Sequence, residues 1–115
     1  MPYLLIATNR PLDPSQSATL ARRASARVGD LTGKDERWVM VTVRGGEAML
    51  FGGSDEPCVY MELKSLGLEA SEAEALSSGL CRFVVSALGV AAERVYVEMS
   101  SPDGALWGWN GSTFA

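Results

Sequence analysis

The chain has 115 residues, of which 47% are hydrophobic and 21% are charged, and its formal net charge at pH 7 is −4. This length predicts a single domain, residues 1–115, with one hydrophobic core. Nucleic-acid binding needs dense positive charge, and a membrane span needs ~18 consecutive apolar residues; the sequence has neither, so nucleic acid and membrane are not expected partners.

The first half of the chain predicts a strand, a helix and a second strand. Apolar residues run from 3 to 8, as in a buried strand. Segment 13–16 then supplies an N-cap Asp, a Pro for the first helical position and a Gln for a capping box. Apolar residues recur at helical spacing over 20–31, and Gly33 is a suitable C-terminal stop. The β-branched and apolar segment 38–43 predicts the second strand.

The second half repeats this order of elements. Segment 58–64 predicts a strand. Segment 71–74 then has the spacing of a capping box, and the apolar residues over 76–87 mark the buried face of a second helix, which ends at Gly89. Segment 94–99 predicts a further strand. Two β-α-β units in one domain predict an α/β (α+β) fold, with a four-stranded mixed sheet and both helices on one face.

The C-terminal segment is rich in large aromatic side chains. Trp107, Trp109 and Phe114 all lie within its last nine residues. Rings of this size are unfavourable on an exposed tail, so we expect them to pack against another surface. A neighbouring copy of the chain would provide one, which predicts a homo-oligomer.

The N-terminus and the thiols indicate the compartment. Residues 1–10 have neither the basic leader nor the long apolar run of a signal peptide, so we expect a cytoplasmic protein whose export would follow a non-classical route. Cys58 and Cys81 do not form a disulfide framework; both are expected to be reduced, with Cys81 in the core. Histidine is absent, so a proton-transferring site needs another base: a carboxylate, a lysine, a thiol or the α-amine.

Seven segments, in order along the whole chain, resemble the macrophage migration inhibitory factor (MIF) family. The most specific are the central and the terminal segments, because the others are short. The segments are Met1-Pro2, Thr8-Asn9, Thr32-Gly33-Lys34, Phe51-Gly52-Gly53-Ser54-Asp55-Glu56-Pro57-Cys58, Ser65-Leu66-Gly67, Arg94-Val95-Tyr96 and Gly108-Trp109-Asn110-Gly111-Ser112-Thr113-Phe114-Ala115.

This resemblance implies an assembly and an activity. The family builds a homotrimer from subunits of two β-α-β units, with active sites between subunits. Its members are keto–enol tautomerases of aromatic α-keto acids such as phenylpyruvate, and some act on dopachrome-type substrates. The resemblance implies no cofactor and no metal.

The resemblance also implies a role for particular residues. Pro2, made N-terminal by loss of Met1, corresponds to the general base, which must be neutral at working pH. Lys34 corresponds to the lysine that binds the substrate carboxylate, Leu66 lines the pocket, and Tyr96 comes from the adjacent subunit. The remaining substrate-binding positions form the pocket walls and rim, where packing in the core or an interface is the alternative role: Tyr3, Trp38, Ser65, Trp107, Trp109 and Phe114.

Several positions depart from the family pattern. Glu98 replaces a polar amide that reaches substrate, and a carboxylate there would repel an anion or favour the protonated Pro2 amine. Trp107 narrows the pocket mouth, and Lys64 adds positive charge near the entrance. Met61 replaces the second cysteine of a Cys-x-x-Cys motif, so no thiol–disulfide activity is expected.

The alternatives to an enzyme are a cytokine-like protein-binding factor, whose receptor binding the sequence leaves open, and a trimeric domain with neither role.

Overall fold

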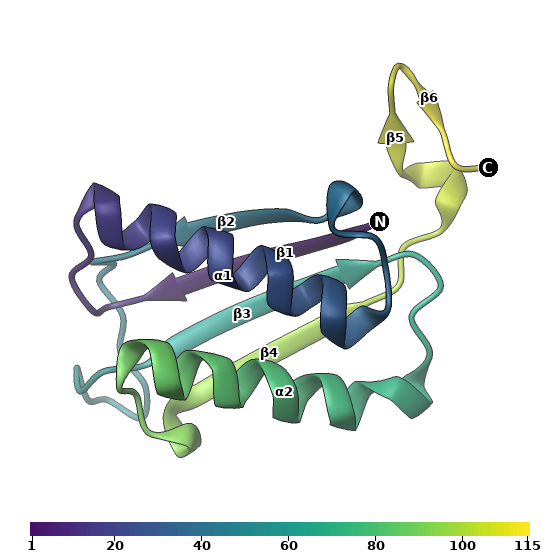
Figure 1. Ribbon diagram of the computed structural model, residues 1–115. Helices are drawn as coiled ribbons and strands as arrows, with labels where there is room; N and C mark the ends of the chain where they lie inside the picture. Colours follow the sequence, from purple (N-terminus) through teal and green to yellow (C-terminus); the bar gives the residue numbers. More distant parts are fainter.

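The computed structural model describes residues 1–115 and contains two long helices, four main strands and a short C-terminal hairpin (Figure 1). Three single turns of 3-10 helix connect these elements. In chain order they are β1 (Pro2–Thr8), α1 (Pro14–Thr32), η1 (Glu36–Trp38), β2 (Met40–Arg44), β3 (Val59–Ser65), α2 (Ala70–Leu88), η2 (Ala92–Arg94), β4 (Val95–Ser100), η3 (Gly104–Leu106), β5 (Gly108–Trp109) and β6 (Ser112–Thr113).

The main sheet has the strand order β2-β1-β3-β4. Each β-α-β unit forms a parallel pair, β1 with β2 and β3 with β4, and the two units meet through the antiparallel pair of β1 and β3. Both helices cover the same face of the sheet (Figure 1). The predicted four-stranded mixed sheet, with its two helices on one face, is therefore confirmed.

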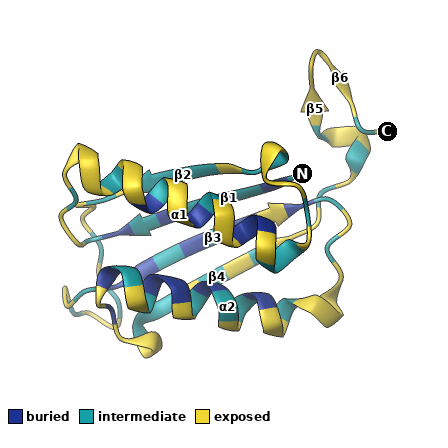
Figure 2. Cartoon of the chain, in the orientation of Figure 1, coloured by how far each residue is buried: buried dark blue, intermediate teal, exposed yellow.

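Alternate residues of the two central strands point toward the helices and form the core with the inner helix faces. On β1 and β3 these residues are almost fully buried, and Figure 2 shows the matching buried stripes along α1 and α2. The capping box at Asp13 and the left-handed Gly33 set the ends of α1 as predicted. The core residues are Leu4, Ile6, Leu20, Ala24, Val28, Val59, Met61, Leu63, Leu76, Leu80, Phe83, Val84, Leu88 and Val90.

Four local predictions are wrong. Trp38 lies in η1 rather than in a strand, because Asp35 caps that turn by accepting from the Arg37 N–H. Helix α2 begins at Ala70, since the Glu72 carboxylate accepts from the Glu69 N–H, two residues earlier than the predicted capping box.

The other two errors concern the fourth strand and a thiol. Arg94 ends η2 instead of opening β4. Cys81 is only partly buried, whereas Cys58 is 2% exposed and lies in the interior. Both cysteines are free, as expected.

The other face of the sheet has no layer of the same chain on it (Figure 1). At its C-terminal end the chain leaves the sheet and forms the β5–β6 hairpin, whose turn is the left-handed pair Asn110 and Gly111. Neither long helix combines the length and the apolar character needed to cross a bilayer.

Candidate functional site

The N-terminal end of β1 opens into a cavity of about 720 Å³. The sheet forms one side of this cavity, and the C-terminal segment from Pro102 to Phe114 forms another. Its lining residues are Met1, Pro2, Tyr3, Arg37, Trp38, Val39, Met40, Lys64, Pro102, Leu106, Trp107, Gly108, Trp109 and Phe114. Six of the ten sequence-predicted site residues are therefore together in one cavity, although they come from three separate parts of the chain.

Aromatic rings in mutual contact build much of the wall. The edge of Trp38 meets Trp109 with ring centroids 4.9 Å apart, and Trp109 stacks on Phe114 at 6.0 Å with planes 13° apart. The Phe114 N–H also donates to the Gly104 carbonyl at 3.0 Å, which closes the end of the chain onto η3. These contacts hold the hairpin over the N-terminus and give the cavity flat apolar surfaces suited to a planar ring.

Pro2 lies in the wall of this cavity and is among the most buried residues of the chain. It is opposite Ser65 in the antiparallel register of β1 and β3, and Ser65 is itself only 1% exposed. The next residue, Tyr3, donates from its hydroxyl to Thr42 Oγ1 at 2.9 Å, which connects β1 to β2 near the cavity.

Lys34 lies close to the N-terminus and is held in place by its own chain. Its Nζ donates to the Leu66 carbonyl at 2.7 Å. Lys34 and Ser65 line a smaller hollow of about 40 Å³ on the helix side of the sheet. Leu66 lines neither space, but its carbonyl fixes the ammonium, which keeps donors for a ligand.

Burial lowers the pKa of the Met1 α-amine from its ordinary value, and the nearby positive charge of Lys34 lowers it further. Both causes disfavour the protonated amine, the first by desolvating the charge and the second by repulsion. The chain therefore places its N-terminal amine where a neutral form is favoured.

The charges around the cavity are of one sign. Arg37 and Lys64 line it, and none of the lining residues is acidic, although the chain has 14 acidic and 10 basic residues. The nearest ion pairs are Arg37 Nε to Asp35 at 3.8 Å and Lys64 to Glu62 at 3.9 Å, both at the surface. Exposed pairs of this length stabilise little, so the positive potential of the cavity remains.

Tyr96 and Glu98 lie away from the cavity of their own chain. Tyr96 pairs with Tyr60 on β3, several residues along the sheet from the position of Pro2, and its side chain is 63% exposed. A role for Tyr96 in substrate binding therefore requires another subunit. Glu98 accepts a hydrogen bond from the Tyr60 hydroxyl at 3.3 Å on the uncovered face of the sheet.

Sequence reasoning missed several lining residues. Arg37 is the most informative, because its guanidinium lies 4.8 Å from the centroid of the Trp38 ring. Met40, Pro102 and Leu106 complete the mouth. An arginine in a charged loop is usually solvated, so only its position immediately before a predicted pocket tryptophan could have singled it out.

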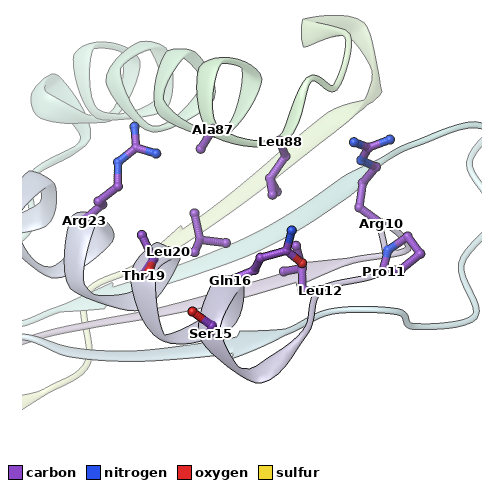
Figure 3. A pocket seen from close by; sticks show the side chains of 10 residues that line it. All are labelled: Arg10, Pro11, Leu12, Ser15, Gln16, Thr19, Leu20, Arg23, Ala87 and Leu88. Atoms are coloured by element: carbon purple, nitrogen blue, oxygen red, sulfur yellow. The ribbon is translucent and has the colours of Figure 1, made fainter.

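A second hollow, of about 290 Å³, lies between α1 and α2 on the helical side of the molecule (Figure 3). Arg10 and Arg23 stand on either side of its leucine side chains. It contains none of the predicted site residues, and it lies toward the C-terminal end of β1, whereas Pro2 is at the opposite end of that strand.

The family model described as Macrophage migration inhibitory factor (MIF) matches residues 1–115. The macrophage migration inhibitory factor homologue of Brugia malayi is 36% identical over 115 residues, which cover 99% of both chains. Macrophage migration inhibitory factor of Meriones unguiculatus is 30% identical over 116 residues, covering 100% of both.

Solved structures of macrophage migration inhibitory factors have the same fold as this chain. The macrophage migration inhibitory factor homologue from Prochlorococcus marinus superposes with a TM-score of 0.91 at 34% identity, covering 98% of this chain and 99% of that one. The macrophage migration inhibitory factor from Trichinella spiralis gives 0.88 at 28% identity, with 97% and 99% covered. The chain belongs to the macrophage migration inhibitory factor family.

Proposed function

We propose that the protein is a keto–enol tautomerase of aromatic α-keto acids such as phenylpyruvate, with Pro2 as the general base once Met1 is removed. The observation that carries this proposal is the position of Pro2: a buried proline at the N-terminus, in an aromatic-walled cavity with cations and no acids around it. A planar ring suits the walls, and a carboxylate suits the charge.

The reaction moves one proton. In the direction of the enol, the neutral Pro2 nitrogen takes a proton from the carbon next to the ketone, and the C–H electron pair forms the C=C bond. The carbonyl oxygen takes a proton from the Pro2 ammonium, directly or through a water molecule that the ammonium reprotonates. The ketone forms by the reverse path. Lys34 would bind the carboxylate and stabilise the negative charge that gathers on the enolate.

The protonation state of Pro2 follows from its surroundings. Burial and the charge of Lys34 lower the pKa of the Met1 amine. After removal of Met1 the Pro2 amine begins one residue deeper, beside the same lysine, so we expect the same two causes to lower the pKa of that amine as well. A base must be neutral to accept a proton, which makes this shift favourable for catalysis.

We infer a homotrimer with active sites between subunits. Large apolar side chains are exposed at both ends of the sheet, with Leu50 71% and Tyr96 63% exposed at one end and Leu106 86% exposed at the other. Contact between opposite ends of neighbouring copies would cover both groups and bring Tyr96 to the next subunit's cavity. Sedimentation at several concentrations tests this: trimers are expected, and a stable monomer contradicts it.

The enzyme assay uses protein whose loss of Met1 is confirmed by mass spectrometry. Phenylpyruvate ketonisation should fall at least ~100-fold in Pro2→Gly, within the range of general-base contributions. Pro11→Gly, a proline in the loop at the far end of β1, is the matched control and should retain activity. An alanine inserted between Met1 and Pro2 turns the Pro2 nitrogen into an amide and should also abolish it. Equal inactivity of the wild type and Pro2→Gly refutes the proposal.

A protein-binding role is the second candidate. The relatives named above are called factors that inhibit macrophage migration, which describes an effect on cells. The uncovered apolar residues such as Leu106 could serve a partner as well as a second copy. Binding to a partner protein that survives Pro2→Gly would support this role, and retention of every exposed apolar residue within a trimer interface would argue against it.

A further inference from the structure

We propose that Arg37 forms a second anion subsite at the mouth of the cavity, so that the preferred substrates are aromatic keto acids with an additional negative group on the far end of the ring. The inference rests on the proposed function and names its substrate class. The cations near the N-terminus outnumber those that one substrate carboxylate would require.

In the proposed mechanism, Lys34 supplies the one positive charge that the substrate carboxylate needs. It lies beside the N-terminal amine and is fixed by the Leu66 carbonyl at 2.7 Å, on the helix side of the sheet. Arg37 and Lys64 line the large cavity itself, and the proposed mechanism gives neither of them a task. In a chain of net charge −4, the part of the cavity that one subunit supplies has two cations and no acid, which indicates a ligand with more negative charge than a single carboxylate.

The volume of the cavity also indicates a ligand larger than a single-ring keto acid. Pockets of about 300–1,000 Å³ hold drug-sized ligands, and this cavity measures about 720 Å³. Within one subunit, this volume is larger than a single-ring keto acid needs. A group attached to the far end of the ring would extend into that space.

Arg37 is better placed than Lys64 to bind the added group. In the sheet register Met40 and Lys64 lie on opposite sides of Tyr3, so Arg37, three residues before Met40, and Lys64 approach the cavity from different sides. The Arg37 guanidinium lies on the Trp38 ring, 4.8 Å from its centroid. That contact orients the planar donor fork, which can bind a carboxylate through two hydrogen bonds.

The competing partner of Arg37 is weak. Asp35 approaches its Nε only to 3.8 Å, and both side chains are mostly exposed, at 71% and 66%. An ion pair of this kind contributes little and exchanges readily. An incoming carboxylate can therefore displace Asp35 from the guanidinium.

A binding measurement tests the subsite without depending on turnover. The probes are 3-phenylpropionate, its para-carboxy derivative and its para-carbamoyl derivative, which is neutral and has the same shape. Binding is followed by the fluorescence of the tryptophans that line the cavity. We expect the para-carboxy probe to bind about tenfold more tightly than the para-carbamoyl probe, and the preference to shrink with added salt.

Three variants test whether Arg37 causes the preference for the para-carboxy probe over the para-carbamoyl probe. Arg37→Gln should reduce the preference for the para-carboxy probe to less than twofold. Arg37→Lys should retain part of it, because the charge stays but the fork is lost. Arg44→Gln removes an equal charge from the other end of β2 and should keep the full preference.

The outcomes separate the two proposals. A wild type without a preference, or a preference that survives Arg37→Gln, overturns the subsite whether or not the protein turns over phenylpyruvate. A preference that requires Arg37 supports the subsite even if no keto acid is turned over, in which case the tautomerase proposal alone fails. If turnover is present, the same ranking should appear in kcat/KM for para-carboxyphenylpyruvate and its carbamoyl analogue.

Discussion

Removal of the Arg94 side chain should destabilise the protein by about 2–4 kcal/mol, through the loop between β2 and β3. Its guanidinium donates to four carbonyls of that loop: Nε to Pro57 at 3.0 Å, Nη1 to Phe51 at 3.2 Å, and Nη2 to Ser54 and Glu56 at 3.1 and 3.0 Å. It also lies 5.2 Å from the centroid of the Phe51 ring.

The magnitude follows from the number and exposure of these bonds. A net hydrogen bond is worth about 0.5–1.5 kcal/mol, but the loop is largely exposed, so the freed carbonyls regain water and each loss lies near the low end. Four such losses with one cation–π contact give about 2–4 kcal/mol for Arg94→Ala. Arg94→Lys should lose about half of that, because one ammonium cannot reach four carbonyls.

Urea unfolding at one fixed protein concentration measures the effect, since assembly makes the midpoint depend on concentration. Arg44→Ala, an exposed arginine at the end of β2, is the control and should change the free energy of unfolding by less than ~0.5 kcal/mol. A value for Arg94→Ala within that same margin would refute the reasoning. It would mean that the loop holds its shape without the guanidinium.

Two further predictions concern the tail and the uncovered face of the sheet. A Cβ at Gly104 would lie 2.5 Å from the Phe114 carbonyl oxygen. Gly104→Ala should therefore displace the hairpin and raise KM for phenylpyruvate several-fold, whereas the control Ala105→Gly should not. An unchanged KM in Gly104→Ala would contradict this. Burial, followed by the charges of Glu62 and Glu98, raises the pKa of Tyr60. The absorbance at 295 nm reports tyrosinate, and its difference between the wild type and Tyr60→Phe gives the titration of Tyr60. The midpoint of that titration should lie above the ordinary value of about 10, and Glu98→Gln should lower it partway. A midpoint at or below 10 would contradict this.

The fold was predictable because its signals are local and regular. Alternating burial on β1, the capping box at Asp13 and the left-handed Gly33 all follow from a few neighbouring residues. The errors arose where two local signals competed. Glu69 and Glu72 form the capping box of α2, two residues before the predicted pair Ser71 and Glu74.

The site was only partly predictable because it joins distant segments. The resemblance to the family located Pro2, Lys34 and the tail aromatics, whereas Arg37 belongs to no family motif and enters the cavity through its contact with Trp38. The four bonds of Arg94 to the distant loop are another long-range feature that periodicity does not encode. Contacts of this kind depend on the folded path of the chain.

The pH dependence of kcat/KM for phenylpyruvate, with protein free of Met1, tests the central claim most directly. A base must be unprotonated, so the rate should rise with pH and level off above the Pro2 pKa. We expect a midpoint below the ordinary α-amine value of about 8, and a higher midpoint in Lys34→Gln, because the lysine charge opposes protonation. A rate that is independent of pH, or a profile that is the same in Pro2→Gly, would contradict Pro2 as the base.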